Sequence, residues 1–229
     1  MTSIIKVQNI QYTDGDAALT IADGGGVTAV NGLTSTGAAV FNGSVSGTAM
    51  TLLNSLTVSS PVANVTYTSS LITDDYMDYR ITYRAVTPSS NGQKFWVYCS
   101  IDNGSNYNLN TEQHLMYHDT KASKAFGMAS TANDGNRFDL NSSIGSASNK
   151  GNNGTIEFQG LRQTSTEYKS AFWNSVAGIS SDSGHDGGND YWWNGGGKIF
   201  TSSKINNIKI QMQSGTIAKG IFSLYGIKS

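Results

Sequence analysis

Residues 76–85 read YMDYRITYRA, and the alternation within this stretch decides the fold class. Every second residue is apolar, namely Met77, Tyr79, Ile81, Tyr83 and Ala85. Successive side chains of a β-strand point to opposite faces, so the pattern predicts a strand with one buried face. Arg80 and Arg84 lie on the other face, which is typical of an antiparallel sheet with one face in water.

A second alternating run extends from Lys94 to Ile101. It places four apolar residues on one face, namely Phe95, Val97, Cys99 and Ile101. We therefore expect Cys99 to lie on the buried face of a strand. Because Cys99 is the only cysteine, the sequence excludes an intrachain disulfide and a cysteine-based zinc site within one chain.

Further strands are predicted where apolar runs are bounded by Asn, Gly and Ser. These runs are residues 112–118, 123–129, 155–161, 167–173, 198–202, 207–213 and 216–227. No amphipathic helix of useful length appears, and strands do not alternate with helices. The pattern predicts an all-β fold, in which residues 63–229 form an antiparallel β-sandwich head domain with jelly-roll topology as the leading choice.

The N-terminal 62 residues consist of short apolar pieces separated by turn residues. The turns include Asp14-Gly15, Asn31-Gly32 and Asn42-Gly43. One copy of this segment offers too little large apolar surface for a core. Three copies wound around one axis would bury the valines and Phe41, so residues 23–62 are predicted to form a turn-rich trimeric β-stalk. The alternative is a disordered linker.

The composition narrows the classes of partner. Charged residues make up 14 % of the 229 residues and the formal net charge is −1, against about 25 % charged residues in ordinary soluble domains. No run of Lys or Arg could neutralise successive phosphates, so nucleic acid is not an expected partner. No apolar run reaches the roughly 20 residues of a membrane span, and no secretory signal pattern opens the chain. We expect synthesis in a cytoplasm without membrane insertion.

Three segments resemble structural proteins of tailed phages that infect aquatic bacteria. Residues 1–21 resemble the start of such proteins, residues 37–45 look like the shafts of phage fibres, and residues 220–228 are similar to the last strand of their β-sandwich heads. The resemblance implies a virion protein whose residues 1–22 attach to the particle. The apolar residues expected to make this attachment are Ile4, Ile5, Val7 and Ile10.

A candidate binding site follows from the loop at residues 181–190, which leads into Tyr191, Trp192 and Trp193. Consecutive aromatic residues on a strand point to opposite faces, so at least one of the two tryptophan rings should leave the core. An exposed ring beside Asp190 and Asn194 would suit a sugar-stacking platform for a host glycan. The alternative is that these rings pack against a neighbouring loop or subunit. The acidic loop itself is interpreted as a solvated loop, with a calcium site as the alternative.

The sequence favours structural roles for the other polar residues that form recognisable patterns. The run around Asp102, Asn103 and Gly104 is similar to an Asp-box hairpin, in which the aspartate caps the turn. His114 and His118 would share one face of a strand, but a metal site needs a third ligand, for which the sequence offers only Asp119 and His185 nearby. No local pattern nominates a catalytic pair among the available carboxylates, so we expect no catalytic residue, metal or cofactor. These carboxylates are Glu112, Asp134, Asp139, Glu157 and Glu167.

These observations lead to a hypothesis of a non-enzymatic virion protein. It would be a homotrimeric tail fibre that contacts other proteins of the tail or baseplate and attaches to the host surface, where polysaccharide is the candidate receptor. The first alternative is a decoration or cement protein on the capsid surface. The second is a polysaccharide-degrading tailspike.

Overall fold

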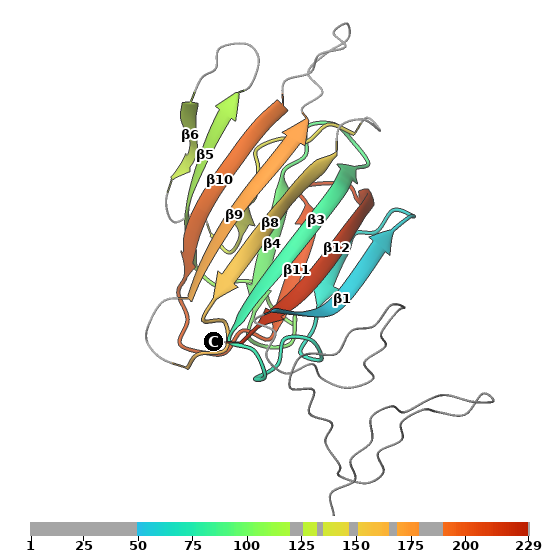
Figure 1. Ribbon diagram of the computed structural model, residues 1–229. Helices are drawn as coiled ribbons and strands as arrows, with labels where there is room; N and C mark the ends of the chain where they lie inside the picture. Colours follow the sequence, from blue (N-terminus) through green and yellow to red (C-terminus); the bar gives the residue numbers. More distant parts are fainter. Residues whose placement is uncertain are drawn as a thin grey trace, which may run out of the picture. The chain divides into compact units, whose positions relative to one another are not determined.

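The structure of the protein is a computed structural model, and it describes residues 50–119, 126–131, 135–146, 151–164, 169–178 and 190–228. These residues all belong to the second of the two units into which the chain divides, Gly47–Ser229. They form two antiparallel sheets, one of eight strands and one of four, and include no helix. The predicted all-β, two-sheet antiparallel architecture is confirmed (Figure 1).

The larger sheet lies across the front of Figure 1. Its strands, in spatial order, are β1 (Met50–Val58), β12 (Ile217–Ile227), β3 (Asp78–Pro88), β8 (Asn152–Gln159), β9 (Lys169–Gly178), β10 (Asp190–Ile199), β5 (Thr111–Asp119) and β6 (Phe126–Thr131). The smaller sheet lies behind it and has the order β2 (Asn64–Tyr67), β11 (Asn207–Met212), β4 (Phe95–Ser100) and β7 (Phe138–Asp139). We call the face of the larger sheet that is turned away from the smaller one the outer face.

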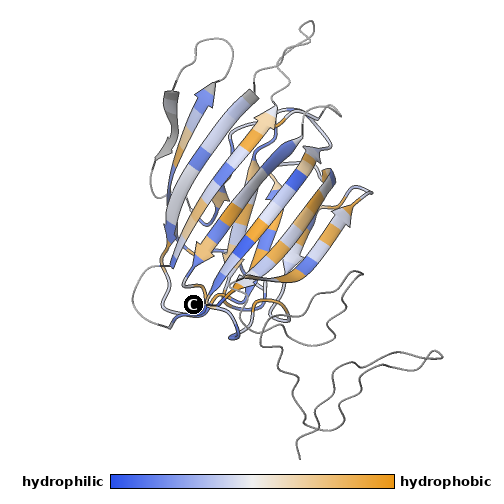
Figure 2. Ribbon diagram, viewed as in Figure 1, coloured by the Kyte–Doolittle hydropathy of each residue, from blue (hydrophilic) through white to orange (hydrophobic). Residues whose placement is uncertain are grey.

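Alternation of hydrophobic and polar residues produces these strands, as Figure 2 shows for the larger sheet. In β3 the predicted inward set is buried at Tyr79, Ile81 and Tyr83. Arg80 lies on the outer face, where it pairs with Glu157 of β8 at 3.0 Å. From Tyr79 to Tyr83, β3 thus turns an apolar row toward the core and a polar row toward solvent.

The alternation of β3 breaks at Ala85, which was expected on the buried face and is exposed. The register with β8 shifts between Tyr83 and Val86, and Ala85 has a positive φ of 51°. Its amide donates to Asn153 Oδ1 at 2.9 Å. This β-bulge adds one residue to the strand and returns Val86 to the core, and such a change of phase is not visible in the sequence.

Aromatic rings from both sheets meet in a single core. Tyr83 of β3 packs edge-on against Phe95 of β4 with 5.2 Å between ring centroids. Phe95 also lies 6.3 Å from Phe222 of β12. Further along, Phe138 of β7 lies 5.4 Å from Trp173 of β9. The two sheets are therefore held together by interdigitated side chains, the packing expected of a β-sandwich.

The N-terminal boundary of the folded domain needs a correction. The sequence assigned residues 50–58 to the stalk and began the head domain at residue 63. These residues are β1, which pairs along almost its whole length with β12, from Met50 opposite Ile227 to Val58 opposite Gly220. The head domain therefore includes β1, which carries no strong alternation because it is an edge strand with several exposed residues.

The rest of the predicted stalk, residues 23–49, and the predicted attachment segment, residues 1–22 with Ile4, Ile5, Val7 and Ile10, lie outside the described residues. The part of the chain that the structure describes contains no helix capable of crossing a membrane.

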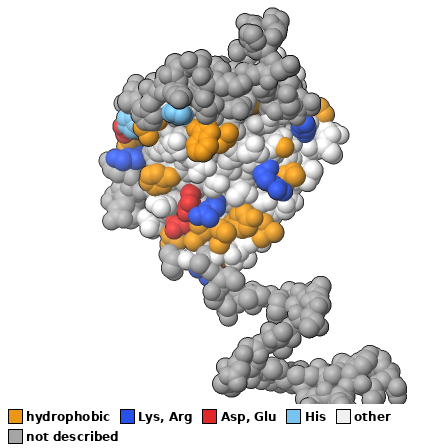
Figure 3. All heavy atoms as spheres, turned by 45° about the horizontal axis from the view of Figure 1, so that its top comes forward, with side chains coloured by type: hydrophobic (Ala, Val, Ile, Leu, Met, Phe, Trp, Pro, Cys, Tyr) orange, Lys and Arg blue, Asp and Glu red, His pale blue; other side chains and the backbone are white. Residues whose placement is uncertain are grey.

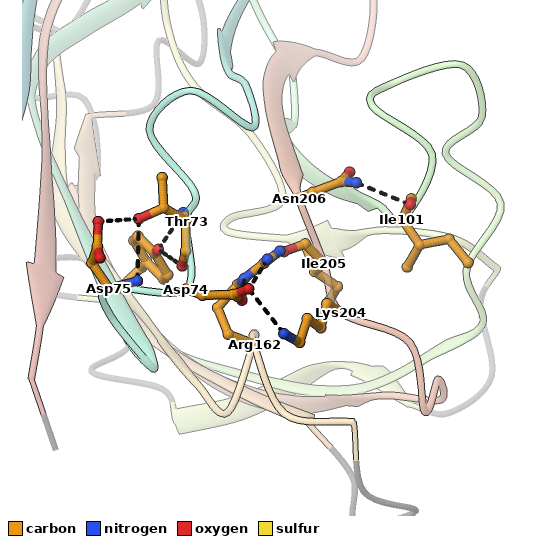
Figure 4. A network of polar contacts seen from close by, with 9 residues as sticks. Thr73, Asp74, Asp75, Ile101, Arg162, Lys204, Ile205 and Asn206 are labelled. Atoms are coloured by element: carbon orange, nitrogen blue, oxygen red, sulfur yellow. Dashed lines mark hydrogen bonds and ion pairs between the residues drawn. The ribbon is translucent and has the colours of Figure 1, made fainter.

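One end of the sandwich is held by a polar network (Figure 4). The guanidinium of Arg162, which follows β8, donates to Asp74 Oδ1 at 2.9 and 2.6 Å and to the Ile205 carbonyl at 2.8 Å. Lys204 Nζ donates to Asp74 Oδ2 at 2.9 Å. Hydrogen bonds from Lys204 and Arg162 lower the pKa of Asp74. The network links loops of both sheets, so we assign it a structural role.

The buried thiol of Cys99 provides a test of this fold. Cys99 is buried on β4 as predicted, and burial raises its pKa to about 12. The thiolate, which is the reactive form, is therefore both scarce and shielded at pH 8. We expect no reaction with a thiol reagent in the native protein and one thiol per chain after unfolding in guanidinium. Full labelling of the native protein would contradict the placement of β4.

Candidate functional site

Strand β10 carries the aromatic residues that the sequence singled out. Trp193 points into the domain and is 2 % exposed, whereas its neighbour Trp192 points outward and is 56 % exposed. The prediction that at least one of these two rings leaves the core is therefore confirmed. The sequence had placed a strand at residues 198–202, but β10 runs from Asp190 to Ile199 and includes the whole glycine run.

Tyr191 and Trp193, which were predicted to belong to a glycan platform, lie on the inner side of the sheet instead. Their rings stack with 5.7 Å between centroids, and the Trp193 ring lies 5.3 Å from that of Tyr117. Tyr191 is packed against the core. Strand alternation explains this placement, since residues 191 and 193 share a face opposite to residue 192. The side chain of Asp190 and the loop at residues 179–189 lie outside the described residues.

Asn194, the remaining predicted binding residue, shares the outer face with Trp192. The cross-strand register places Trp192 between His118 of β5 and Val176 of β9. It places Asn194 in the same way between Met116 and Asn174. Aromatic, aliphatic and amide side chains therefore adjoin one another on this face. Figure 3 shows the hydrophobic side chains in separate groups on a surface that is mainly neither hydrophobic nor charged.

From Asn194 to Lys198 of β10, the outer face forms a groove with a volume of about 590 Å³. Its lining comes from three neighbouring strands: Glu112, His114 and Met116 of β5, Asn194, Gly195, Gly196, Gly197 and Lys198 of β10, and Ser170 and Phe172 of β9. Phe172, which is 52 % exposed, forms one wall. We refer to this feature as the β10 groove.

Three consecutive glycines of β10 serve the two faces of the sheet differently. A Cβ atom on Gly195 would clash with the ring of Trp173, and one on Gly197 would clash with the backbone oxygen of Glu112 and lie 2.6 Å from the ring of Phe138. Neither position can therefore carry a side chain without displacing a core ring or, at residue 197, the neighbouring strand as well. Gly196, between them, faces outward, where a Cβ would meet only the Phe172 ring at 3.2 Å and then ordinary contacts. The missing side chain at Gly196 opens the groove.

The β10 groove is lined by one Lys and one Glu side chain, whose charges offset each other. Lys198 of β10 lies directly opposite Glu112 of β5 in the register, so one positive and one negative group flank its end. His114 and His118 both lie exposed on the outer face, as expected for residues four apart on a strand. Among the residues that the structure describes, no cluster of His, Cys, Asp and Glu could hold a metal ion. His185 and the side chain of Asp119 are not among them.

Two carboxylates that the sequence offered as possible catalytic groups are engaged in ion pairs. Asp139 accepts from Lys94 at 3.1 Å and from Arg137 at 3.2 Å, and Glu157 pairs with Arg80. Glu112 lines the β10 groove. Asp134 and Glu167 lie outside the described residues. Asp139 and Glu157 are thus explained by structural contacts.

Asp102 caps a turn, as predicted. Its Oδ1 accepts hydrogen bonds from Ser100 Oγ at 2.6 Å and from the Asn106 amide at 2.9 Å. Asn103 and Gly104 have positive φ angles of 59° and 85°, conformations that Asn and Gly tolerate. Hydrogen bonds from Ser100 and from the side chain and backbone amide of Asn106, with the one from Ser100 contributing most, lower the pKa of Asp102 to about 2. Asp102 is a structural residue of the turn.

The comparisons with known proteins identify no relative of this chain. No family model, curated protein or solved structure matches the chain. The function is therefore argued from the geometry of this domain and from the sequence.

The opposite orientations of the two tryptophans give a stability test. Trp193→Ala removes a buried ring and should destabilise the fold by about 3–5 kcal/mol. Trp192→Ala removes an exposed ring and should change stability by about 0.5 kcal/mol or less. Guanidinium unfolding followed by circular dichroism measures both. Equal losses would contradict the assigned faces of β10.

Proposed function

We propose that this chain is a structural protein of a tailed-phage virion, a homotrimeric tail fibre whose β-sandwich head attaches to glycan on the host surface. The observation that carries the proposal is the exposed ring of Trp192. It shares the outer face of β10 with Asn194, which lines the β10 groove. An apolar ring flanked by amide groups is a common arrangement for binding sugars, because the ring packs on the C–H face and the amides bond hydroxyl groups.

The strand order supports a jelly-roll topology for the head. Strands β1 to β4 alternate between the two sheets, and so do β7 with β8 and β11 with β12. The order β1-β12-β3-β8 faces β2-β11-β4-β7, which is the eight-strand arrangement of two antiparallel sheets found in viral and sugar-binding domains. In this interpretation β5, β6, β9 and β10 are insertions that widen one sheet, and they carry the proposed site.

The exposed apolar residues of β1 support a trimeric assembly of the chain. Met50, Leu52 and Leu56 of β1 are all exposed, and β1 forms one edge of the larger sheet. A long apolar edge strand is normally covered in a stable assembly. Contact with two further copies would cover it. Three heads on one stalk would then bind several glycans at once, so weak single sites would suffice for attachment.

The oligomeric state tests the stalk. Light scattering of the full-length protein at micromolar concentration should give three times the chain mass of 24.4 kDa. The reason is that one copy cannot bury the apolar residues of its N-terminal segment. A monomer mass under these conditions would remove the trimeric stalk from the proposal.

Attachment is tested by adsorption of labelled full-length protein to a panel of aquatic bacterial isolates. Trp192→Ala should lower adsorption to the isolates that bind wild type, because the loss of ring stacking costs about 1–3 kcal/mol per site and the loss compounds across a trimer. Ile101→Ala, which shortens an exposed apolar side chain after β4, is the matched control and should adsorb normally.

Unchanged adsorption of the Trp192 variant, or no adsorption of wild type to any isolate, would count against host attachment by this face. The capsid-decoration alternative would then gain, since the exposed edge of β1 could equally cover a shell subunit. Imaging of particles labelled on this protein separates tail from capsid.

A further inference from the structure

The outward side chains of β10 form one continuous row. Trp192, Asn194, Gly196 and Lys198 occupy alternate positions of the same strand. Trp192 is four residues from Gly196, which corresponds to about 13 Å along the strand. The exposed tryptophan and Gly196 in the β10 groove are therefore two contact points on one line, farther apart than a single sugar ring can reach.

The groove has the form of a slot with a flat floor. Gly196 lies between Phe172 of β9 and His114 of β5 in the register. Neighbouring strands are about 4.8 Å apart, so the residues on the two sides of Gly196 stand about 10 Å from each other. The three glycines of β10 contribute to the floor, and one wall is the Phe172 ring, which would lie 3.2 Å from a Cβ atom on Gly196. A flat ring with an apolar face fits such a slot.

The polar groups along the row match a ligand without net charge. Asn194 and its neighbour Asn174 each offer amide N–H donors and a carbonyl acceptor, a combination that suits hydroxyl groups. Lys198 and Glu112 offset each other at the far end. An acidic polysaccharide would find no cluster of cations among the described residues of this row.

An extended peptide is a poorer fit for the same row. Peptides commonly bind sheets by adding a strand at a free edge. β10 is paired along its whole length with β9 on one side and β5 on the other, so its backbone groups are already used. The ligand has to be recognised by side chains on the face of the sheet.

We propose that this row binds an uncharged saccharide chain of at least three sugar units, which lies along β10 with one unit stacked on Trp192 and another in the β10 groove against Phe172. The proposal rests on the proposed function and specifies its ligand. Trp192 supplies an open platform and the groove supplies the length selectivity.

Binding of full-length protein to an array of neutral and acidic oligosaccharides of one to six units tests the proposal, followed by calorimetry on the tightest. Wild type should bind a neutral chain of three or more units at least tenfold more tightly than the matching mono- or disaccharide. Gly196→Leu fills the slot and should lower affinity for the long chain at least tenfold. Phe172→Ala, which removes an exposed wall without filling anything, should lower it as well.

Thr82→Leu is the matched control, since it adds the same side chain to the outer face on β3, outside the groove, and should bind as wild type. Melting of each variant verifies that it is folded. If Gly196→Leu and Phe172→Ala bind the long chain as wild type does, or if chain length has no effect, the length inference is overturned while attachment through Trp192 stands. Binding restricted to acidic glycans would overturn the ligand class. Binding to none would overturn both this inference and glycan attachment.

Discussion

The aromatic layer between the two sheets, in which Tyr83, Phe95 and Phe222 meet, is the constraint on which the rest of the domain depends. Each ring is buried, and such ring pairs add about 0.5–1.5 kcal/mol beyond the burial of their area. The layer continues through Phe138 and Trp173 toward β9 and β10. Strands at the far side of the larger sheet are thereby fixed to the same core.

The glycine run of β10 shapes both faces of the larger sheet. Trp173 and Phe138 lie so close to β10 that Gly195 and Gly197 can carry no side chain. Strand alternation then leaves Gly196 facing outward, between Phe172 and His114. The absence of a side chain at Gly196 thus leaves a groove beside an exposed tryptophan on a strand that is paired on both sides, an arrangement that needs little ordering to bind a ligand.

The surface chemistry agrees with attachment to a neutral, hydroxyl-rich partner. The chain has few charges and many amide and hydroxyl side chains, and several charged residues of the described domain form pairs, such as Arg80 with Glu157. A surface of this kind gains little from long-range electrostatic attraction. In the proposed fibre, several identical weak sites compensate for modest affinity at each one.

The sequence by itself determined the all-β class, most of the buried faces of β3 and β4, the burial of Cys99 and the exposure of one of the two tryptophans, because each follows from the two-residue period of a strand. The last residue of each predicted buried row was wrong, since Ala85 and Ile101 are exposed. Tertiary structure alone decided the rest. The bulge at Ala85, the inclusion of β1 in the head and the passage of β10 through three glycines depend on partners far away in the chain. Phe172 and Met116 gave no signal of a site, since they join Trp192 only through the pairing of β9 and β5 with β10. Cross-strand neighbours are set by register, and register is fixed by the packing of the whole core.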